Sequence, residues 1–210
     1  MFRQFWKQSN IVSKNLFFYD YLVNDLNCSF VWKCSQRNIL HNYRNISDNH
    51  IEIGPGTGYF LKNKTFDTLQ LLDINNDILT NASLNLKGNC SQIKSFQHDI
   101  FTSSLPQLSK CNSIGLTYVL HCLPGKIENN LDNLIRHIPY KNYNLYGASV
   151  IRDPVEKNSL AEMELFWLNK IGVFNNSNDT YSSLEKYFKK NNFQYDLKLE
   201  GYVAIFNIAV

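Results

Sequence analysis

Short apolar runs recur along the chain from residue 50 onward and are separated by segments with helical periodicity. Such runs are typical of buried strands, and apolar positions three and four residues apart are typical of amphipathic helices. Strands that alternate with helices predict an α/β fold with a doubly wound, mostly parallel sheet and helices on both faces. The predicted strands are 50–53, 69–72, 93–97, 113–118 and 145–150, and the clearest helices are 76–86 and 127–137.

The pattern changes at both ends of the chain. Two strand-like runs, 195–199 and 202–209, are separated only by Glu200 and Gly201, which is too short for a helical crossover. They are predicted to form an antiparallel hairpin at an edge of the sheet. Residues 2–45 are predicted to be largely helical, with an aromatic face that either closes over a pocket as a lid or packs as ordinary core. That face is formed by Phe5, Trp6, Leu16, Phe17, Phe18, Tyr19, Tyr21 and Leu22.

Chain length and charge restrict the class of protein. A chain of 210 residues is predicted to form a single domain, with an N-terminal helical cap at 1–45 and a Rossmann-like core at 46–210. The net charge of +3 is small, and Lys and Arg are scattered along the chain. No electrostatic footprint for nucleic acid is visible, which argues against a nucleic-acid partner. The sequence makes no prediction of the oligomeric state.

The five cysteines form an odd set without a CxxC pair, which argues against both a disulfide framework and a zinc site. No metal site is predicted. The N-terminus lacks the apolar run of a signal peptide, and no stretch approaches the roughly 20 apolar residues of a membrane span. These features predict reduced thiols, a cytoplasmic location and no membrane contact.

The strongest motif is the sequence IEIGPGTG at 51–58, an apolar strand that runs into a glycine-rich turn. Glycine is needed where the backbone takes a positive φ or approaches a ligand closely. A dinucleotide site would have glycine at position 59, where this chain has Tyr59. A carboxylate at Glu52 would repel a pyrophosphate but suits a ligand with an ammonium and a sulfonium group, which favours S-adenosylmethionine over NAD. The predicted cofactor contacts here are Glu52, Gly54, Gly56 and Gly58.

Two further carboxylates follow the next two strands. Asp73, beside Ile74, lies about 20 residues past the glycine turn, where a carboxylate can accept hydrogen bonds from both ribose hydroxyls. A helix cap is its alternative role, although Asn75 could cap that helix instead. Asp99 and Ile100 end the third strand, where they could bind the amino group and the ring face of adenine. Because parallel strands end at one edge of the sheet, these residues predict a single adenosine site.

The fourth strand leads to the candidate catalytic residues. Tyr118 lies at the strand end and is predicted to line the methyl-donor pocket. His121 follows, and its unperturbed pKa near neutrality would suit a general base, with a structurally satisfied histidine as the alternative. Cys122 has no partner base nearby in the sequence and is interpreted as core. The segment also lacks the Asn/Asp-Pro-Pro-aromatic run that clamps an exocyclic amine of a nucleobase.

With these motifs the chain resembles the class I S-adenosylmethionine-dependent methyltransferases, from about Trp32 to the C-terminus. Within that superfamily it is similar to a group of small, mostly uncharacterised bacterial and fungal enzymes, through the blocks WKC, HIEIGPGTGYFL, LLDIN, YVLHCLPGK, GVFNN-x-x-D and GYVAIF. The resemblance implies a seven-stranded sheet of order 3-2-1-4-5-7-6 with the last strand antiparallel. It also implies a cofactor site on the glycine turn, Asp73, and Asp99 with Ile100.

The acceptor of the methyl group is not implied, because enzymes of this superfamily keep the cofactor site and vary the acceptor pocket. The lack of a basic face and the aromatic N-terminal block favour a small-molecule acceptor, methylated on oxygen, nitrogen or sulfur. An RNA or protein methyltransferase and a non-catalytic S-adenosylmethionine-binding regulatory subunit are the alternatives. The candidate substrate-binding residues are Tyr19, Tyr21, Trp32, Phe174 and Asn175, beside the catalytic candidates His121 and Tyr118.

Overall fold

The computed structural model describes residues 28–100 and 106–210, and the structural statements below concern these residues. A sheet of seven strands runs through them in the order β3-β2-β1-β4-β5-β7-β6. Strands β1 to β5 pair in parallel, and β7 is antiparallel to both of its neighbours. The predicted strand order and antiparallel last strand are confirmed. The strands are β1 (Asn49–Ile53), β2 (Phe66–Asp73), β3 (Cys90–Gln97), β4 (Ser113–Thr117), β5 (Asn144–Val150), β6 (Gln194–Glu200) and β7 (Val203–Ala209).

Every predicted strand is present, with small differences at the ends. Strands β2 and β3 begin earlier than predicted, because Phe66 and Cys90 already pair with each other in the ladder. Strand β4 ends at Thr117 rather than at Tyr118. Tyr118 takes a φ of 60°, which an extended strand does not allow.

The two helices predicted most clearly are confirmed as α5 (Asn76–Leu86) and α6 (Ile127–His137). Helix α5 is capped by Asn75, whose side chain accepts a hydrogen bond from the backbone N–H of Asp77. The other helices are α4 (Gln36–Asn42), α7 (Ser159–Lys170) and α8 (Tyr181–Lys190), and the 3-10 turns are η2 (Tyr43–Asn45), η3 (Tyr59–Leu61), η4 (Lys87–Asn89) and η5 (Leu120–Cys122).

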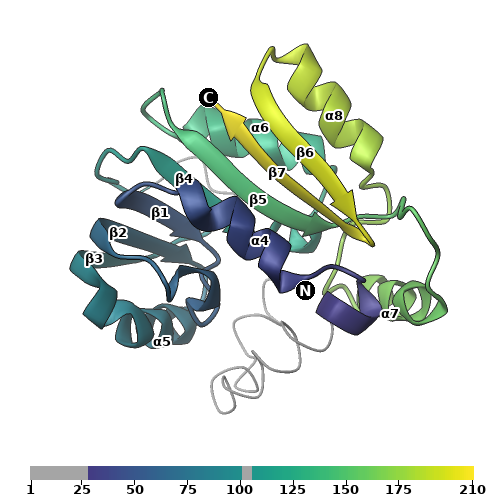
Figure 1. Cartoon of the computed structure of the whole chain (residues 1–210), viewed down its shortest axis with the longest axis horizontal. Helices are drawn as coiled ribbons and strands as arrows, with labels where there is room; N and C mark the ends of the chain where they lie inside the picture. The colour runs from purple at the N-terminus through teal and green to yellow at the C-terminus, as the bar shows by residue number, and fades with distance from the viewer. Residues whose placement is uncertain (1–27, 101–105) are drawn as a thin grey trace.

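Helices cover both faces of the sheet. Because alternate residues of a strand point to opposite faces, the helices on each face pack against a different set of side chains. Helices α6 and α8 pack on one face against side chains such as Ile51, Ile114 and Phe206. Helices α5 and α7 pack on the other face, where α4 crosses strands β5 and β7 (Figure 1). The fold is thus a three-layer α/β sandwich.

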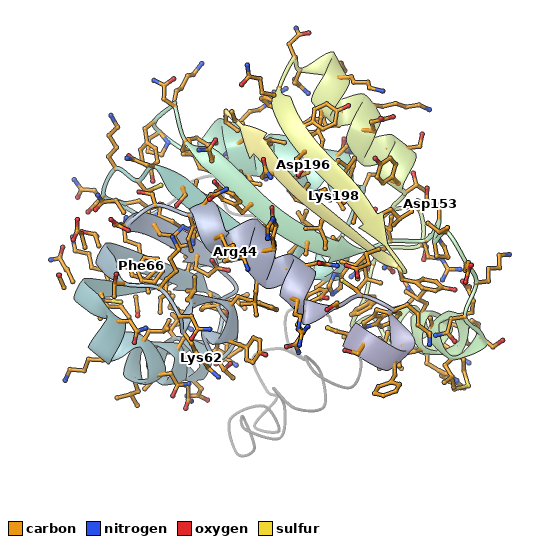
Figure 2. The ribbon with its side chains drawn as sticks, viewed as in Figure 1. Arg44, Lys62, Phe66, Asp153, Asp196 and Lys198 are labelled. Carbon is orange, nitrogen blue, oxygen red and sulfur yellow. The ribbon has the colours of Figure 1, made fainter. Side chains whose placement is uncertain are left out.

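The C-terminal hairpin of β6 and β7 is also confirmed, with β6 at the edge of the sheet. Asp196 and Lys198 lie on this edge strand, where Lys198 Nζ is 3.1 Å from Asp196 Oδ2 (Figure 2). Charged side chains on an edge discourage pairing with another chain. The hairpin turn fits closely against the N-terminal segment, since a Cβ on Gly201 would lie 2.1 Å from the carbonyl oxygen of Trp32.

The N-terminal block predicted to be helical is described only from residue 28 onward, where it contains α4 and η2. Tyr19, Tyr21 and the predicted lid lie outside the described residues, so these remain predictions. Within the described ranges, no helix is long and apolar enough to cross a membrane. The same ranges contain no group of three His, Cys, Asp or Glu side chains arranged to hold a metal ion.

Candidate active site

The glycine turn after β1 has the backbone conformation that its sequence predicts. Gly54, Gly56 and Gly58 have φ values of 65°, 55° and 82°, a region that favours glycine. A Cβ on Gly54 would lie 2.4 Å from Val119 Cγ2, and one on Gly58 would lie 2.7 Å from Leu86 Cδ1. A Cβ on Gly56 would meet no atom of the described residues within 4 Å. The outer glycines therefore allow close packing, and the middle one faces open space within the part of the chain that the structure describes.

Glu52 lies below this turn, in a buried polar network. The residue is only 4% exposed, and its Oε1 accepts a hydrogen bond of 2.9 Å from the hydroxyl of Tyr43. Oε2 is 2.9 Å from His50 Nε2. Thr117 donates to the Tyr43 hydroxyl at 2.9 Å, and His50 Nδ1 is 2.7 Å from Ser113 Oγ. Both carboxylate oxygens are thus held from β1, β4 and η2.

Gly115 provides the space for this network. Glu52 pairs with Gly115 across β1 and β4, and a Cβ on Gly115 would lie 1.9 Å from Glu52 Oε2. Glu52 was expected from the sequence, but Gly115 and the other members of this network were not, although a pattern was present. Polar or small residues alternate along two buried strands, and alternate residues share a face of a sheet. The residues in question are His50 and Glu52 on β1, and Ser113, Gly115 and Thr117 on β4.

Asp73 ends β2 beside the glycine turn, as predicted from its position in the sequence. Oδ1 accepts a hydrogen bond of 2.8 Å from the backbone N–H of Asn75. Burial raises the pKa of Asp73 to about 6, and hydrogen bonds from the N–H groups of Asn75 and Ile74 oppose that rise. Since Asn75 caps α5, the carboxylate of Asp73 is not used as the cap of that helix.

Asp99 and Ile100 follow β3 at the same edge of the sheet. The N–H of His98 donates to the carbonyl of Asp73 at 2.9 Å, which continues the ladder between β2 and β3 beyond the strands. This contact brings Asp99 next to the end of β2. Ile100 is partly buried and packs against the core on the α6 side. The ends of β1, β2 and β3 therefore carry Glu52, Asp73 and Asp99 in neighbouring positions.

Tyr118 directly follows β4 and is fixed by its surroundings. Its hydroxyl accepts a hydrogen bond of 3.2 Å from Cys28 Sγ, and its ring lies 6.3 Å from that of Phe60, which follows the glycine turn. Burial raises the pKa of Tyr118 well above its ordinary value. The phenol therefore stays protonated at neutral pH. Its position links the glycine turn with the residues that follow β4.

His121 is buried in η5 and is 4% exposed. The backbone N–H of Val150 donates to His121 Nδ1 at 3.3 Å, and Ser149 Oγ is 3.5 Å from the same nitrogen. Burial lowers the pKa of His121 to about 3, so the imidazole is neutral at physiological pH. A neutral imidazole that accepts at Nδ1 carries its proton on Nε2. The ring nitrogen opposite Val150 is therefore a hydrogen-bond donor.

Aromatic rings from distant parts of the chain surround His121. The ring of Phe174 lies 4.2 Å from the His121 ring, edge to face, and the ring of Tyr118 lies 6.0 Å away. Trp32 packs against Phe174 at 6.0 Å. Asn175 binds the same turn, with its N–H donating to the carbonyl of His121 at 2.7 Å. The structure thus brings together the described candidates for acceptor binding.

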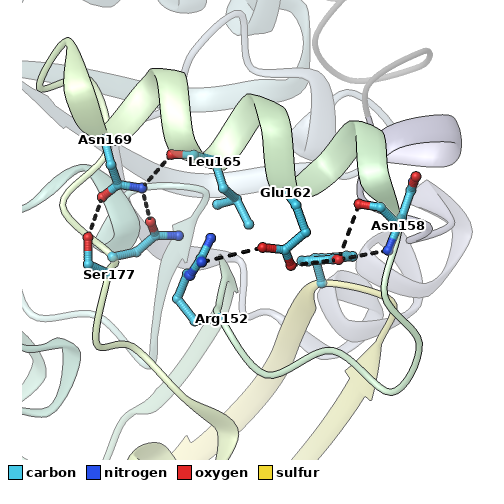
Figure 3. Close-up of polar contacts among 8 residues, drawn as sticks. Arg152, Asn158, Glu162, Leu165, Asn169 and Ser177 are labelled. Carbon is cyan, nitrogen blue, oxygen red and sulfur yellow. Dashed lines mark hydrogen bonds and ion pairs between the residues drawn. The ribbon is translucent and has the colours of Figure 1, made fainter.

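A polar network holds the loop that carries Phe174 and Asn175 in place. Asn169 Nδ2 donates to Leu165 O and to Asn176 Oδ1, and Ser177 Oγ donates to Asn169 Oδ1 (Figure 3). Asn176 is buried and donates to the carbonyl of Val150 at 2.9 Å. The loop is therefore attached both to α7 and to the end of β5. At the other end of α7, Arg152, Glu162, Tyr202 and Asn158 form a second polar cluster in the same view.

Asp179 closes this loop on the far side. It is 1% exposed, and Oδ1 accepts a hydrogen bond of 3.1 Å from the N–H of Ile127, the first residue of α6. Burial and, to a smaller extent, the nearby charge of Glu128 raise the pKa of Asp179 to about 7, although the hydrogen bond from the Ile127 N–H opposes that rise. The final Asp of the GVFNN-x-x-D block thus binds the first N–H of α6.

A pocket of about 300 Å³ lies elsewhere, at the amino ends of β2 and β3. Its lining includes Asp48, Phe66 and Ser91. The glycine turn, Asp73 and Asp99 all lie at the carboxyl ends of these strands. Ligands of open α/β sheets bind at the carboxyl ends, so this pocket is distinct from the candidate site.

The fold and the strand-end residues together define a Rossmann-like nucleoside-binding domain of the methyltransferase type. Comparison with known proteins agrees with this class, although no family model matches the chain. The chain is 30% identical over 184 residues to the uncharacterized protein YbcY of Escherichia coli (strain K12), covering 84% of this chain and 93% of that protein. It is 27% identical to the demethylluteothin O-methyltransferase of Streptomyces thioluteus, covering 94% of this chain and 88% of the relative.

A solved structure of the mitomycin 7-O-methyltransferase MmcR has the same fold. It matches 99% of this chain with a TM-score of 0.63 at 14% identity. The match covers 60% of the length of MmcR, so the chain spans little more than half of that enzyme. From the sequence relatives and the fold, the chain belongs to the class I S-adenosylmethionine-dependent methyltransferases.

Proposed function

We propose that this protein transfers a methyl group from S-adenosylmethionine to a small-molecule acceptor. The observation that carries the proposal is the arrangement at one edge of the sheet, where an open glycine turn lies beside carboxylates at the ends of three adjacent strands. The relative from Streptomyces thioluteus is named as an O-methyltransferase of demethylluteothin, a small molecule. That name supports the acceptor class without deciding between oxygen, nitrogen and sulfur.

The residues at the strand ends fit the parts of the cofactor. The open space at Gly56, between Gly54 and Gly58, suits the methionine part. The carboxylate of Asp73, beside Ile74, suits the two ribose hydroxyls, because each can donate a hydrogen bond to it. In the proposal Asp99 accepts a hydrogen bond from the adenine amino group, and Ile100 contacts the adenine ring.

Glu52 has an indirect role in this proposal. Its two oxygens already interact with Tyr43 and His50, and the residue is nearly buried. A carboxylate fixed below the turn places negative charge near the site where the ammonium and sulfonium groups of the cofactor would lie. We therefore assign Glu52 to charge complementarity and to the support of the turn.

The acceptor would lie next to Tyr118 and His121, between the glycine turn and the loop that carries Phe174 and Asn175. When bound, S-adenosylmethionine supplies a methyl group that is activated by its sulfonium. The chain positions the acceptor in line with that methyl group and excludes water with the rings of Trp32 and Phe174. Tyr19 and Tyr21 remain candidates for this pocket, as part of the predicted lid.

We propose that His121 orients the acceptor as a hydrogen-bond donor. The sequence leaves a general base and a structurally satisfied histidine open at this position, but two observations argue for the donor. Its Nδ1 already accepts a hydrogen bond from Val150, and its pKa of about 3 disfavours the imidazolium that a base must become. The donated hydrogen bond from Nε2 would suit an oxygen of the acceptor.

The cytoplasm remains the proposed location. All five cysteines lie in the described ranges and none forms a disulfide. Thiols of this kind are usual in a reducing compartment.

Ligand binding tests the cofactor assignment directly. Calorimetry should show binding of S-adenosylhomocysteine and no comparable binding of NAD. Because an ionised carboxylate accepts from both ribose hydroxyls more strongly than a protonated one, the affinity for S-adenosylhomocysteine should fall as the pH drops below about 6, the pKa of Asp73. Asp73→Asn should bind about tenfold more weakly and lose that pH dependence. Tight binding of NAD alone would contradict the cofactor assignment.

Methyl transfer tests the acceptor class. Cell extract is incubated with the protein and S-adenosylmethionine labelled in its methyl group, and the products are separated by size. The proposal expects enzyme-dependent label in the small-molecule fraction. Label in RNA or protein would support the alternative methyltransferase classes, and a protein that binds the cofactor but labels nothing would support a non-catalytic subunit.

A further inference from the structure

Gln36, at the start of α4, has a buried amide group that is only half satisfied. The residue is 9% exposed, and its Oε1 accepts a hydrogen bond from the hydroxyl of Tyr59. Its Nε2 is buried and has no hydrogen-bond partner among residues 28–100 and 106–210. Buried polar groups in folded proteins are normally hydrogen-bonded, so a donor without a partner requires an explanation.

The position of Gln36 connects it to the glycine turn. Gln36 and Tyr43 are seven residues apart and lie on the same buried side of α4 and η2. Tyr43 binds Glu52, two residues before Gly54, and Gln36 binds Tyr59, the residue after Gly58. One face of the N-terminal segment therefore contacts the chain on both sides of the glycine turn. The amide of Gln36 therefore lies next to Tyr59, at the end of the glycine turn.

We infer that Gln36 is a cofactor-positioning residue whose Nε2 donates a hydrogen bond to the carboxylate of the methionine part of S-adenosylmethionine. The inference rests on the proposed function. The amino-acid end of this ligand carries an ammonium and a carboxylate. The fixed negative charge of Glu52 favours the ammonium on its side of the turn, and an uncharged donor at the opposite end suits the carboxylate.

Tyr59 has a defined part in this arrangement. By donating to Oε1, its hydroxyl sets which end of the amide is oxygen and which is nitrogen. With the carbonyl end occupied, Nε2 is the atom left for the ligand. Tyr59, which stands where a dinucleotide-binding loop would have glycine, would thus orient the Gln36 amide toward the carboxylate of the ligand.

The test compares two ligands that differ in the amino-acid part. S-Adenosylhomocysteine carries the carboxylate, and 5′-methylthioadenosine keeps the adenosine and the sulfur but lacks the whole amino-acid part. Calorimetry gives the affinity of each ligand for the wild type, Gln36→Met and Gln36→Glu. Gln36→Met should weaken S-adenosylhomocysteine binding about tenfold and leave 5′-methylthioadenosine binding within about twofold, because only the first ligand loses a charge-assisted hydrogen bond. Gln36→Glu should weaken S-adenosylhomocysteine binding further, because two carboxylates would then face each other.

Two further variants separate this role from a structural one. Arg37→Ala alters the exposed neighbour on the same helix turn and should change neither affinity. Tyr59→Phe removes the group that orients the amide while Gln36 remains, and it should weaken S-adenosylhomocysteine binding selectively by about threefold. Urea unfolding of each variant shows whether the fold is intact, and Tyr59→Phe and Gln36→Glu test the inference if Gln36→Met does not fold.

The outcomes distinguish this inference from the proposed function. Equal losses for both ligands in the Gln36 variants, or no loss for S-adenosylhomocysteine, would overturn the role of Gln36 while the cofactor assignment stands. A wild-type protein that binds neither ligand would overturn the proposed function itself.

Discussion

The two halves of the candidate site are built in different ways. On the cofactor side, three glycines with positive φ and carboxylates at the ends of neighbouring strands form the site. On the acceptor side, the rings of Tyr118 and of the distant Phe174 lie next to His121, and Trp32 packs against Phe174 from a third segment. The first half depends on local backbone conformation, and the second depends on how separate segments pack.

The groups that support the two halves also differ. Glu52 is held by side chains of a buried network that extends over β1, β4 and η2. His121 is held mainly by backbone, through the N–H of Val150, and by the loop that Asn176 and Asp179 attach to β5 and α6. A substitution next to the Glu52 network should therefore disturb buried polar atoms under the cofactor side. A substitution at Asn176 or Asp179 should instead loosen the loop on the acceptor side.

The largest effect is expected from Gly115→Ala, behind the cofactor side. Its Cβ would lie 1.9 Å from Glu52 Oε2 and 2.7 Å from the Tyr43 hydroxyl, and central strand β4 has little freedom to move. Crowding and the disruption of a buried carboxylate should lower the free energy of unfolding by about 3 kcal/mol. Urea denaturation measures this change.

Gly88→Ala is the matched control, because a Cβ there would meet no atom of the described ranges within 4 Å. Its free energy of unfolding should stay within about 0.5 kcal/mol of the wild type. Equal stability of the two alanine variants would show that the network around Glu52 does not depend on Gly115.

The next effect is expected from Asp179→Asn, behind the acceptor side. Asparagine keeps the oxygen that accepts from Ile127 and removes the buried charge. Because the folded pKa of Asp179 is raised from 3.8 to about 7, its favourable contribution is complete below about pH 4 and is lost as the pH rises through 7. The variant should therefore match the wild type near pH 4 and exceed its free energy of unfolding at pH 8 by more than about 1 kcal/mol, the equivalent of one pKa unit.

Urea denaturation at several pH values checks this difference. Asp77→Asn removes an exposed carboxylate and serves as the control for the loss of one charge. If the Asp179 and Asp77 variants show the same pH dependence, Asp179 is not ionising in a buried site.

Gly56→Ala should separate ligand binding from folding. The φ of 55° should cost an alanine about 1 kcal/mol of stability, and the open space around the Cβ should let the fold survive. The methyl group would occupy space needed by the cofactor, so binding of S-adenosylhomocysteine should weaken at least about tenfold. Calorimetry and urea denaturation are measured on the same samples.

Asn142→Ala provides the control, since Asn142 also has a positive φ, of 64°, but lies at the amino end of β5. It should lose stability without losing affinity. A similar loss of affinity in both variants would show that Gly56→Ala acts through the stability of the fold and not through the space at the glycine turn.

The smallest effect is expected at His121. If its Nε2 donates one neutral hydrogen bond to the acceptor, His121→Ala should lower kcat/KM about fivefold. Because the pKa of His121 is lowered to about 3, the pH profile between 5 and 8 should keep the same shape in both proteins. An acidic limb that is present in the wild type and absent in the variant would contradict the donor role and restore the general base.

Several features of the site could be predicted because they depend on neighbours in the sequence. Positive φ values follow from glycines in a turn, and the positions of Asp73 and Asp99 follow from where two strands end. The residues His50, Glu52, Ser113 and Gly115 also form an alternating pattern in the sequence. Only the register between β1 and β4 shows that His50 pairs with Ser113 and Glu52 with Gly115.

The sequence by itself determined the succession of strands and helices along the chain, the glycine turn and the strand-end carboxylates, because periodicity and backbone conformation are local properties. The tertiary structure alone decided which groups surround each buried polar side chain. It placed Val150 against His121 Nδ1, Tyr43 against Glu52, and Tyr59 against Gln36, with one amide hydrogen-bond donor left over. Burial and partners set the charge of a group, and both come from segments far apart in the chain.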